Sequence, residues 1–172
     1  ISLPALDNQK VWAGLKLTND QLPQTDANQA YFYYASDGTN GQALSTFTPW
    51  YFINSIGGTD YLTNTGVTVE ADTMYHFKIS IDSDRKASIF INGVQKSVST
   101  SAITAFDGST SVTGTTQATI AANYSAANAN TQKGAAMKND VDLIPYIGIE
   151  NGAAAAEALN VHYTAISRHV FE

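Results

Sequence analysis

The chain of 172 residues contains no cysteine, so its fold does without disulfide bonds and thiolate metal sites. Lysine and arginine together number nine, against 15 acidic residues, and they lie scattered along the chain. A nucleic-acid-binding surface needs clustered cations to neutralise phosphates, so the sequence predicts no nucleic-acid partner. No apolar run approaches the roughly 20 residues that cross a bilayer, so it predicts no membrane partner.

The sequence does contain repeated alternation of apolar and polar residues with a period of two. It runs through residues 11–17 and 67–70, and dense aromatic segments cover residues 31–34 and 47–53. Such runs, bounded by Asn, Asp, Gly and Thr, are typical of β-strands. With 44% apolar residues, the chain has enough material for a core. We therefore expect one all-β domain.

The clearest segment is a hairpin over residues 74–93. Apolar residues at 75, 77, 79 and 81 alternate with polar ones, residues 82–86 form a polar turn, and the apolar positions resume at 87, 89 and 91. Asn92-Gly93 then favours a type I′ turn, because both residue types tolerate a positive φ. The pattern predicts two paired strands followed by a second tight turn.

A long excursion at about residues 97–139 interrupts the strand pattern. It is rich in Ser, Thr, Ala and Asn, and it is too long for an ordinary loop in a compact domain. Residues 117–122 are expected to form a weak strand. Two interpretations stay open: contacts between subunits, or a solvated surface loop. Further strands are expected at residues 143–149 and 159–163.

The hairpin carries a resemblance to a known fold. The segment Tyr75-His76-Phe77-Lys78-Ile79-Ser80-Ile81, its polar turn and the strand ending in Ile91-Asn92-Gly93-Val94 resemble the central hairpin of laminin-G and concanavalin-A-like domains. The segments 145–149 and 159–163 are similar to the closing strands of that fold. The resemblance implies a single domain over residues 1–172, folded as a two-sheet antiparallel jelly-roll sandwich.

The composition is similar to that of concanavalin-A-like structural proteins of tailed bacteriophages, which are acidic, free of cysteine and rich in Thr, Asn and Ala. This second resemblance implies a non-enzymatic protein on the virion surface, in capsid decoration or at the tail. It implies a homo-oligomer that contacts other virion proteins. The alternative is an extracellular, lectin-like carbohydrate-binding module that recognises cell-surface glycans.

The sequence contains part of one known catalytic pattern. Glu70-Ala71-Asp72 matches the first half of the Glu-x-Asp-x-x-Glu pattern of laminarinase-type glycosidases, but the third position is Tyr75. Glycoside hydrolysis needs two carboxyl groups that flank the scissile bond. We therefore interpret residues 70–72 as a turn before the Tyr75 strand. No Gly-x-Ser-x-Gly motif occurs, so no catalytic residue is predicted.

Binding candidates are few. Trp12 and Trp50 are the aromatic residues we examine first for stacking on a sugar, with Asp37 as a third glycan-binding candidate; most other aromatic residues are expected in the core. A single Ca²⁺ at the edge of the sandwich would draw on Asp37, Asp60, Asp82 or Asp84. The favoured interpretation of these carboxylates is that they cap N–H groups in solvated turns, so no cofactor is predicted.

Overall fold

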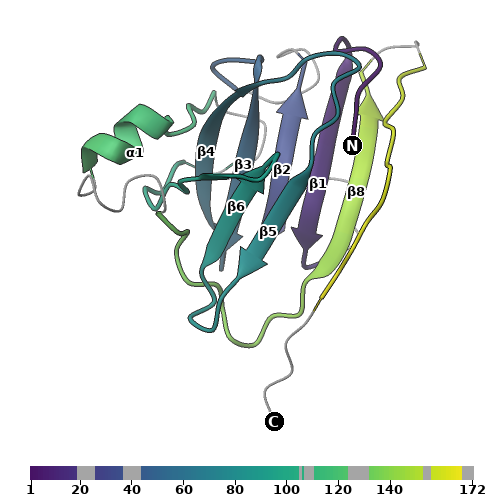
Figure 1. The fold of residues 1–172 in the computed structure, drawn as a ribbon. Coiled ribbons are helices and arrows are strands. Elements are labelled where there is room, and N and C mark those ends of the chain that lie inside the picture. Colours follow the sequence, from purple (N-terminus) through teal and green to yellow (C-terminus); the bar gives the residue numbers. More distant parts are fainter. Residues whose placement is uncertain are drawn as a thin grey trace.

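The computed structural model describes residues 1–18, 26–36, 44–104, 106, 111–123, 132–152 and 156–167. Its strands form two antiparallel sheets in two layers (Figure 1), which confirms the predicted all-β, two-sheet class. The five-stranded sheet has the order β4-β3-β2-β1-β8 and the three-stranded sheet the order β5-β6-β7. The strands are β1 (Gln9–Lys16), β2 (Gln29–Ala35), β3 (Pro49–Ile56), β4 (Thr59–Thr68), β5 (Phe77–Ile81), β6 (Ala87–Ile91), β7 (Val94–Lys96) and β8 (Ile144–Asn151).

The predicted hairpin is confirmed. Strands β5 and β6 pair antiparallel from Phe77 opposite Ile91 to Ile81 opposite Ala87. Asn92 and Gly93 both have positive φ, 51° and 80°, as a type I′ turn requires. The hairpin and its turn involve residues close together in the sequence, so the local pattern was enough to predict them.

The core between the sheets comes from side chains that alternate along the strands. Trp50 and Phe52 of β3 and Phe32 of β2 face Ile89 of β6 across the sandwich, all with no exposed surface. The ring of Phe32 stacks on that of Phe77 of β5 at 4.3 Å. Burial of each such side chain contributes roughly 1.5–3 kcal/mol.

The opposite face of the five-stranded sheet is also buried. We call it the outer face, because it is turned away from β5, β6 and β7. Tyr31 and Tyr33 of β2 point into it, and Phe106 and Val112 of the long excursion cover it. An isolated β-bridge pairs Val112 with Leu44 and so attaches the covering segment to the rest of the fold. The described part of the excursion is therefore integral to the fold.

Within the excursion the predicted strand at 117–122 is wrong: the helix α1 (Gln117–Asn123) lies there, beside β4 (Figure 1). The Thr116 hydroxyl accepts the Thr119 N–H at 3.2 Å and the Thr116 carbonyl accepts the Ile120 N–H at 3.0 Å. A threonine at this position caps the first helical turn, and the alanines favour helix. None of the helices among the described residues is long and apolar enough to cross a membrane.

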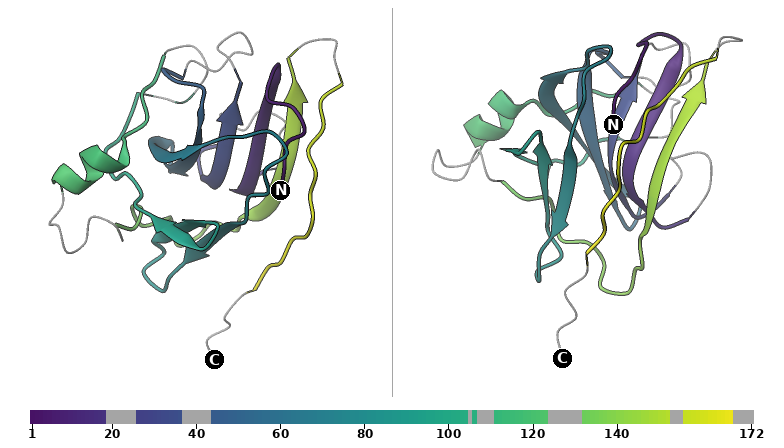
Figure 2. Two further views of the ribbon diagram at one scale, coloured as in Figure 1. Left: turned by 45° about the horizontal axis from the view of Figure 1, so that its top comes forward. Right: turned by 45° about the vertical axis from the view of Figure 1, so that its right-hand side comes forward.

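Residues 1–3 pair with the segment that precedes β5 and with Asn160 near the other end of the described chain. The Tyr75 N–H donates to the Ile1 carbonyl at 2.7 Å, and Ser2 and Asn160 exchange two backbone hydrogen bonds of 3.0 and 2.9 Å. We call residues 156–167 the C-terminal arm. It runs on the β8 side of the sandwich in all three views (Figures 1 and 2). Of the strand predicted at 159–163, only the bridge at Asn160 forms.

Candidate functional site

A row of polar side chains crosses the outer face near one end of the sheet. Lys16 of β1 lies opposite Gln29 of β2, Gln29 opposite Ser55 of β3, and Ser55 opposite Asp60 of β4. The first three have no exposed surface and Asp60 has 8%. Buried polar groups are costly unless they bond to one another, so their partners show what the row does.

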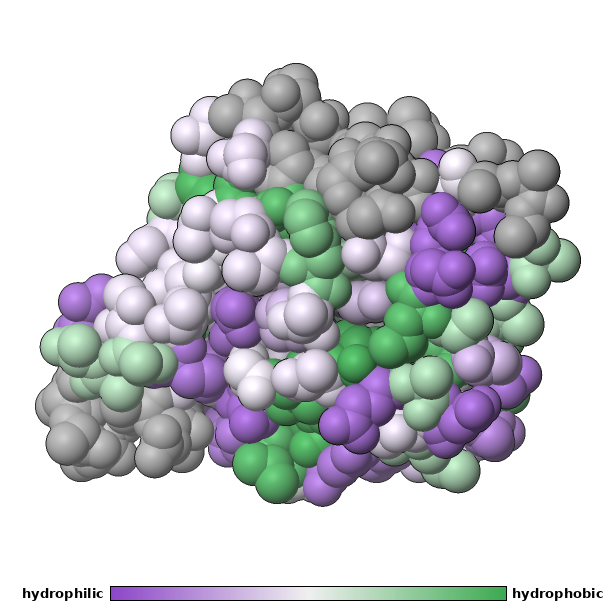
Figure 3. All heavy atoms as spheres, turned by 90° about the horizontal axis from the view of Figure 1, so that it is seen from above, coloured by the Kyte–Doolittle hydropathy of each residue, from purple (hydrophilic) through white to green (hydrophobic). Residues whose placement is uncertain are grey.

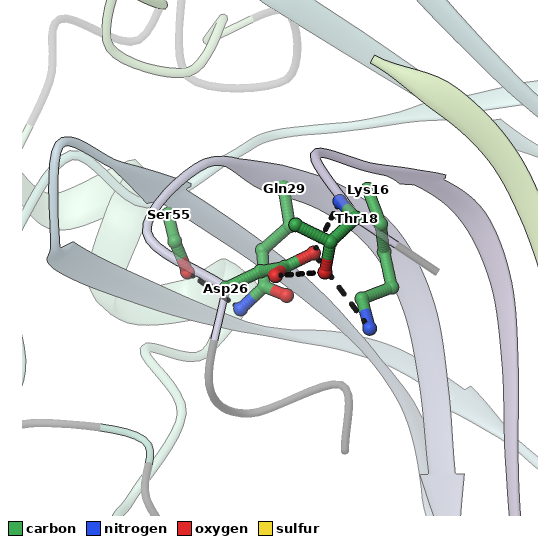
Figure 4. A network of polar contacts seen from close by, with 5 residues as sticks. All are labelled: Lys16, Thr18, Asp26, Gln29 and Ser55. Atoms are coloured by element: carbon green, nitrogen blue, oxygen red, sulfur yellow. Dashed lines mark hydrogen bonds and ion pairs between the residues drawn. The ribbon is translucent and has the colours of Figure 1, made fainter. Parts of the chain in front are cut away.

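Asp26 contacts the Lys16 end of this row (Figure 4). Its carboxylate accepts the Thr18 hydroxyl at 2.7 Å and the Thr18 N–H at 3.1 Å. The Lys16 ammonium lies 3.7 Å from the same carboxylate and 4.6 Å above the ring of Tyr146. The Gln29 amide donates to the Ser55 hydroxyl at 2.9 Å. The network satisfies a buried charge pair and joins β1 to the loop before β2.

Next to the polar row the outer face is aromatic. Trp12 of β1 stacks on Tyr146 of β8, with ring centroids 5.9 Å apart and planes 10° from parallel. Tyr33 meets Phe106 edge-on at 5.5 Å. These rings contact one another and the covering loops, so their faces are occupied within the fold.

Several polar atoms among these side chains have no hydrogen-bond partner in the described structure: the hydroxyls of Tyr31 and Tyr33, the indole N–H of Trp12 and the amide oxygen of Gln29. Burial raises the pKa of Tyr31 and of Tyr33 well above 10. A buried, unpartnered polar group costs about 1–3 kcal/mol. The outer face therefore carries a set of neutral donors and acceptors that the excursion seals from solvent.

The structure places two of the three glycan-binding candidates inside the protein. Trp50 has no exposed surface and contacts the rings of Tyr75 and Phe77 between the sheets. Trp12 is 5% exposed. Sugar stacking needs an open ring face, so neither residue forms the platform for which it was a candidate. Asp37 lies outside the described residues.

Two of the four candidate calcium ligands, Asp60 and Asp82, have other partners. The Asp60 carboxylate accepts the Phe106 N–H at 2.7 Å, and the Asp82 carboxylate lies 2.6 Å from the Lys133 ammonium. The hydrogen bond from Lys133 and the backbone N–H of Lys86 lower the pKa of Asp82. Asp84 is an exposed residue of the same turn. The described residues contain no group of three or more histidines and carboxylates that would hold a metal ion.

The segment at Glu70-Ala71-Asp72 is the turn that the sequence predicted. Asp72 has a φ of 55°, and its N–H donates to the Leu3 carbonyl at 2.8 Å. Tyr75 is buried, and its hydroxyl accepts the Glu70 N–H at 2.8 Å. The two carboxylates are exposed. The position where the glycosidase pattern requires Glu is occupied by Tyr75, whose buried side chain stabilises the turn.

The features that sequence reasoning missed lie along one side of the sandwich. β8 is one of the two end strands of the five-stranded sheet, and the C-terminal arm beside it exposes three apolar side chains. Val161, Tyr163 and Ile166 are 46%, 65% and 71% exposed. The alternation of apolar residues would have indicated these side chains, but not that they face solvent. No family model, no curated protein and no solved structure matches the chain.

Proposed function

We propose that this chain is a non-enzymatic structural protein of a virus particle, a capsid-decoration or tail-associated subunit with a concanavalin-A-like jelly roll. It assembles as a homo-oligomer and contacts other virion proteins. The observation that carries the proposal is the C-terminal arm. Large apolar patches at the surface mark interaction sites, and this arm presents its apolar side chains along an extended segment.

The contacts of the arm fall off along its length. Leu159 still packs against the core between the sheets, and Asn160 is bonded to Ser2. Beyond them the His162 ring lies 3.3 Å from the Ser2 hydroxyl, and the Tyr163 ring lies 5.7 Å from that of His76. The arm is thus anchored at one end and offers Val161, Tyr163 and Ile166 to another surface. A second protein that covers them gains their burial, worth roughly 25 cal/mol for each Å².

The other functional classes find less support in the same residues. A glycosidase requires facing carboxyl groups, and Glu70 and Asp72 share an exposed turn. A lectin-like module requires an open aromatic surface, and Trp12 and Trp50 are enclosed. Hydrophobic patches on the end of the sandwich seen in Figure 3 are small and alternate with polar ones. Glycan binding is therefore the alternative that the experiment has to separate from assembly.

Two measurements on the intact chain make this separation. Light scattering gives the solution mass over a range of protein concentrations, and a glycan array tests binding to sugars. The proposal expects a defined oligomer of the 18.4-kDa chain and no array binding. A protein that is monomeric at every concentration and that binds glycans would contradict the proposal and favour the lectin-like module.

The arm is tested with a triple variant, Val161→Ser, Tyr163→Ser and Ile166→Ser. Its control is Met74→Ser with Val94→Ser, since these apolar side chains are 59% and 58% exposed elsewhere. The arm variant is expected to weaken association, because it removes apolar surface that assembly buries. If the control weakens association as much as the arm variant, the effect is one of general surface hydrophobicity and the arm has no special part.

A further inference from the structure

We infer that the outer edge of β8, at Pro145, Ile147 and Ile149, is the surface through which this protein binds a second copy of itself. Two β8 strands would pair antiparallel about a twofold axis and join the five-stranded sheets of both copies into one sheet of ten strands. The inference rests on the proposed function, because it names the surface and the partner of that assembly.

The backbone of β8 alternates between bonding to β1 and pointing outward. The Ser36 N–H donates to the Gln9 carbonyl and the Leu17 N–H to the Asn28 carbonyl, so odd-numbered residues of β1 bond toward β2. Even-numbered residues of β1 then bond toward β8, as the hydrogen bond from the Gly152 N–H to the Asn8 carbonyl shows. With Trp12 opposite Gly148, even residues of β8 bond to β1. Odd residues direct their N–H and C=O groups away from the sheet.

The odd residues within this edge are Pro145, Ile147 and Ile149. Proline has no N–H, so the edge offers donors at Ile147 and Ile149 and acceptors at all three. The pairing with β1 runs through eight consecutive residues without a shift in register. The edge is therefore long and regular, with one donor removed near its end. Strands of this kind are templates for pairing with another chain.

The opposite end of the five-stranded sheet, β4, is covered within the described chain. Along β4 the Leu62 carbonyl and the Asn64 N–H both bond to Thr115 of the excursion, and the Asp60 carbonyl accepts the Ile103 N–H. In the second sheet, residues 1–3 pair with residues 72–75, which precede β5, and the Val98 N–H, which follows β7, donates to the Gln132 carbonyl. The strands β5 and β7 are five and three residues long, shorter than the eight residues of β8. Along β8, in contrast, no described strand pairs with the outer side.

The chemistry of β8 suits a copy of itself. An antiparallel pair about a twofold axis brings residue i opposite j and j opposite i, so the edge complements itself whatever its sequence. The one charged residue, Glu150, is already paired with Lys10 at 3.0 Å. With the axis at Ile147 or at Gly148, Glu150 meets Ile144 or Tyr146 of the other copy, so like charges stay apart. The arm lies on the same side of the sandwich and would flank the paired β8 strands, which we call the β8 joint.

The test is a proline at the centre of the edge. Ile147→Pro removes the outward N–H and keeps the hydrogen bonds to β1, which come from the even residues. Ile147→Ala is the matched control, because it shortens the side chain and keeps the N–H. Both variants are first shown to be folded by circular dichroism. Sedimentation velocity then compares their masses with that of the unaltered chain.

We expect the unaltered chain and Ile147→Ala to share one oligomeric mass and Ile147→Pro to sediment with a smaller one. An oligomer that Ile147→Pro leaves intact would overturn the β8 joint and leave the proposed function standing. An unaltered chain that is monomeric throughout would overturn the joint, and with array binding it would overturn the proposed function too. If Ile147→Pro fails to fold, Ile144→Glu replaces it, since Ile144 is 40% exposed at the end of the edge and, with the axis at Ile147, the new carboxylate would lie opposite Glu150 of the other copy.

Discussion

Gly148 of β8 lies directly against the indole ring of Trp12 on the neighbouring strand. A Cβ added at Gly148 would come within 2.6 Å of that ring, closer than real Cβ contacts. The missing side chain lets the ring of Trp12 lie flat across β8 and stack on Tyr146. Glycine inside a strand often marks such a close approach.

The contact predicts that Gly148→Ala destabilises the fold by about 1–3 kcal/mol, the usual cost of overpacking. Denaturant unfolding measures it. In a Trp12→Ala background the same substitution should cost much less, because the ring that it strikes is gone. An equal cost in both backgrounds would show that the strain comes from the backbone and not from Trp12.

The unpartnered hydroxyl of Tyr31 yields a second prediction. Tyr31→Phe removes a buried polar atom without a hydrogen-bond partner, so its effect on unfolding free energy should be neutral or stabilising. Tyr51 is the control, because its hydroxyl donates to the Thr46 carbonyl at 3.0 Å. Tyr51→Phe should cost about 1 kcal/mol. A clear loss of stability in Tyr31→Phe would reveal a partner for that hydroxyl in solution.

Asp82 and Lys133 give a prediction on pH. The pKa of Asp82 lies below its ordinary 3.8, chiefly through the hydrogen bond from Lys133. A carboxyl group with a lowered folded-state pKa stabilises the fold above its unfolded-state pKa, and this stability is lost as pH falls through the folded-state value. Lys133→Gln should raise the pKa of Asp82, as read by NMR titration of its carboxyl carbon. Lys138→Gln is the control that should leave it unchanged.

The hairpin of β5 and β6 was predictable because its causes are local: alternation with a period of two, and Asn92-Gly93 at the turn. The same reasoning could not place Trp12 and Trp50. Strands with two buried faces read as continuous apolar runs, and the segment from Trp50 to Ile53 is one. What encloses Trp12 comes from distant segments, Tyr146 above all. Burial of both tryptophans therefore depends on contacts that alternation does not reveal.

The position of β8 at the edge of the sheet could not be predicted from the sequence for a similar reason. β1 and β8 pair across more than half of the chain, and apart from Pro145 neither strand has a residue that indicates which of them ends the sheet. The helix α1 shows a different failure. The segment around Thr116 has a single large apolar residue, Ile120, so its sequence shows neither the period of a strand nor that of a helix distinctly. The Thr116 cap then favours the helix. Pro145 was the one local signal of an edge strand.

Amide hydrogen exchange, followed by NMR on the unaltered chain, tests the β8 joint most directly. The amides of Tyr146, Gly148 and Glu150 bond to β1 and should be protected at every protein concentration. The amides of Ile147 and Ile149 point outward, so only a second copy would protect them. We predict that all five are protected in concentrated protein and that the protection of Ile147 and Ile149 fades on dilution. Fast exchange of Ile147 and Ile149 at every concentration would contradict it.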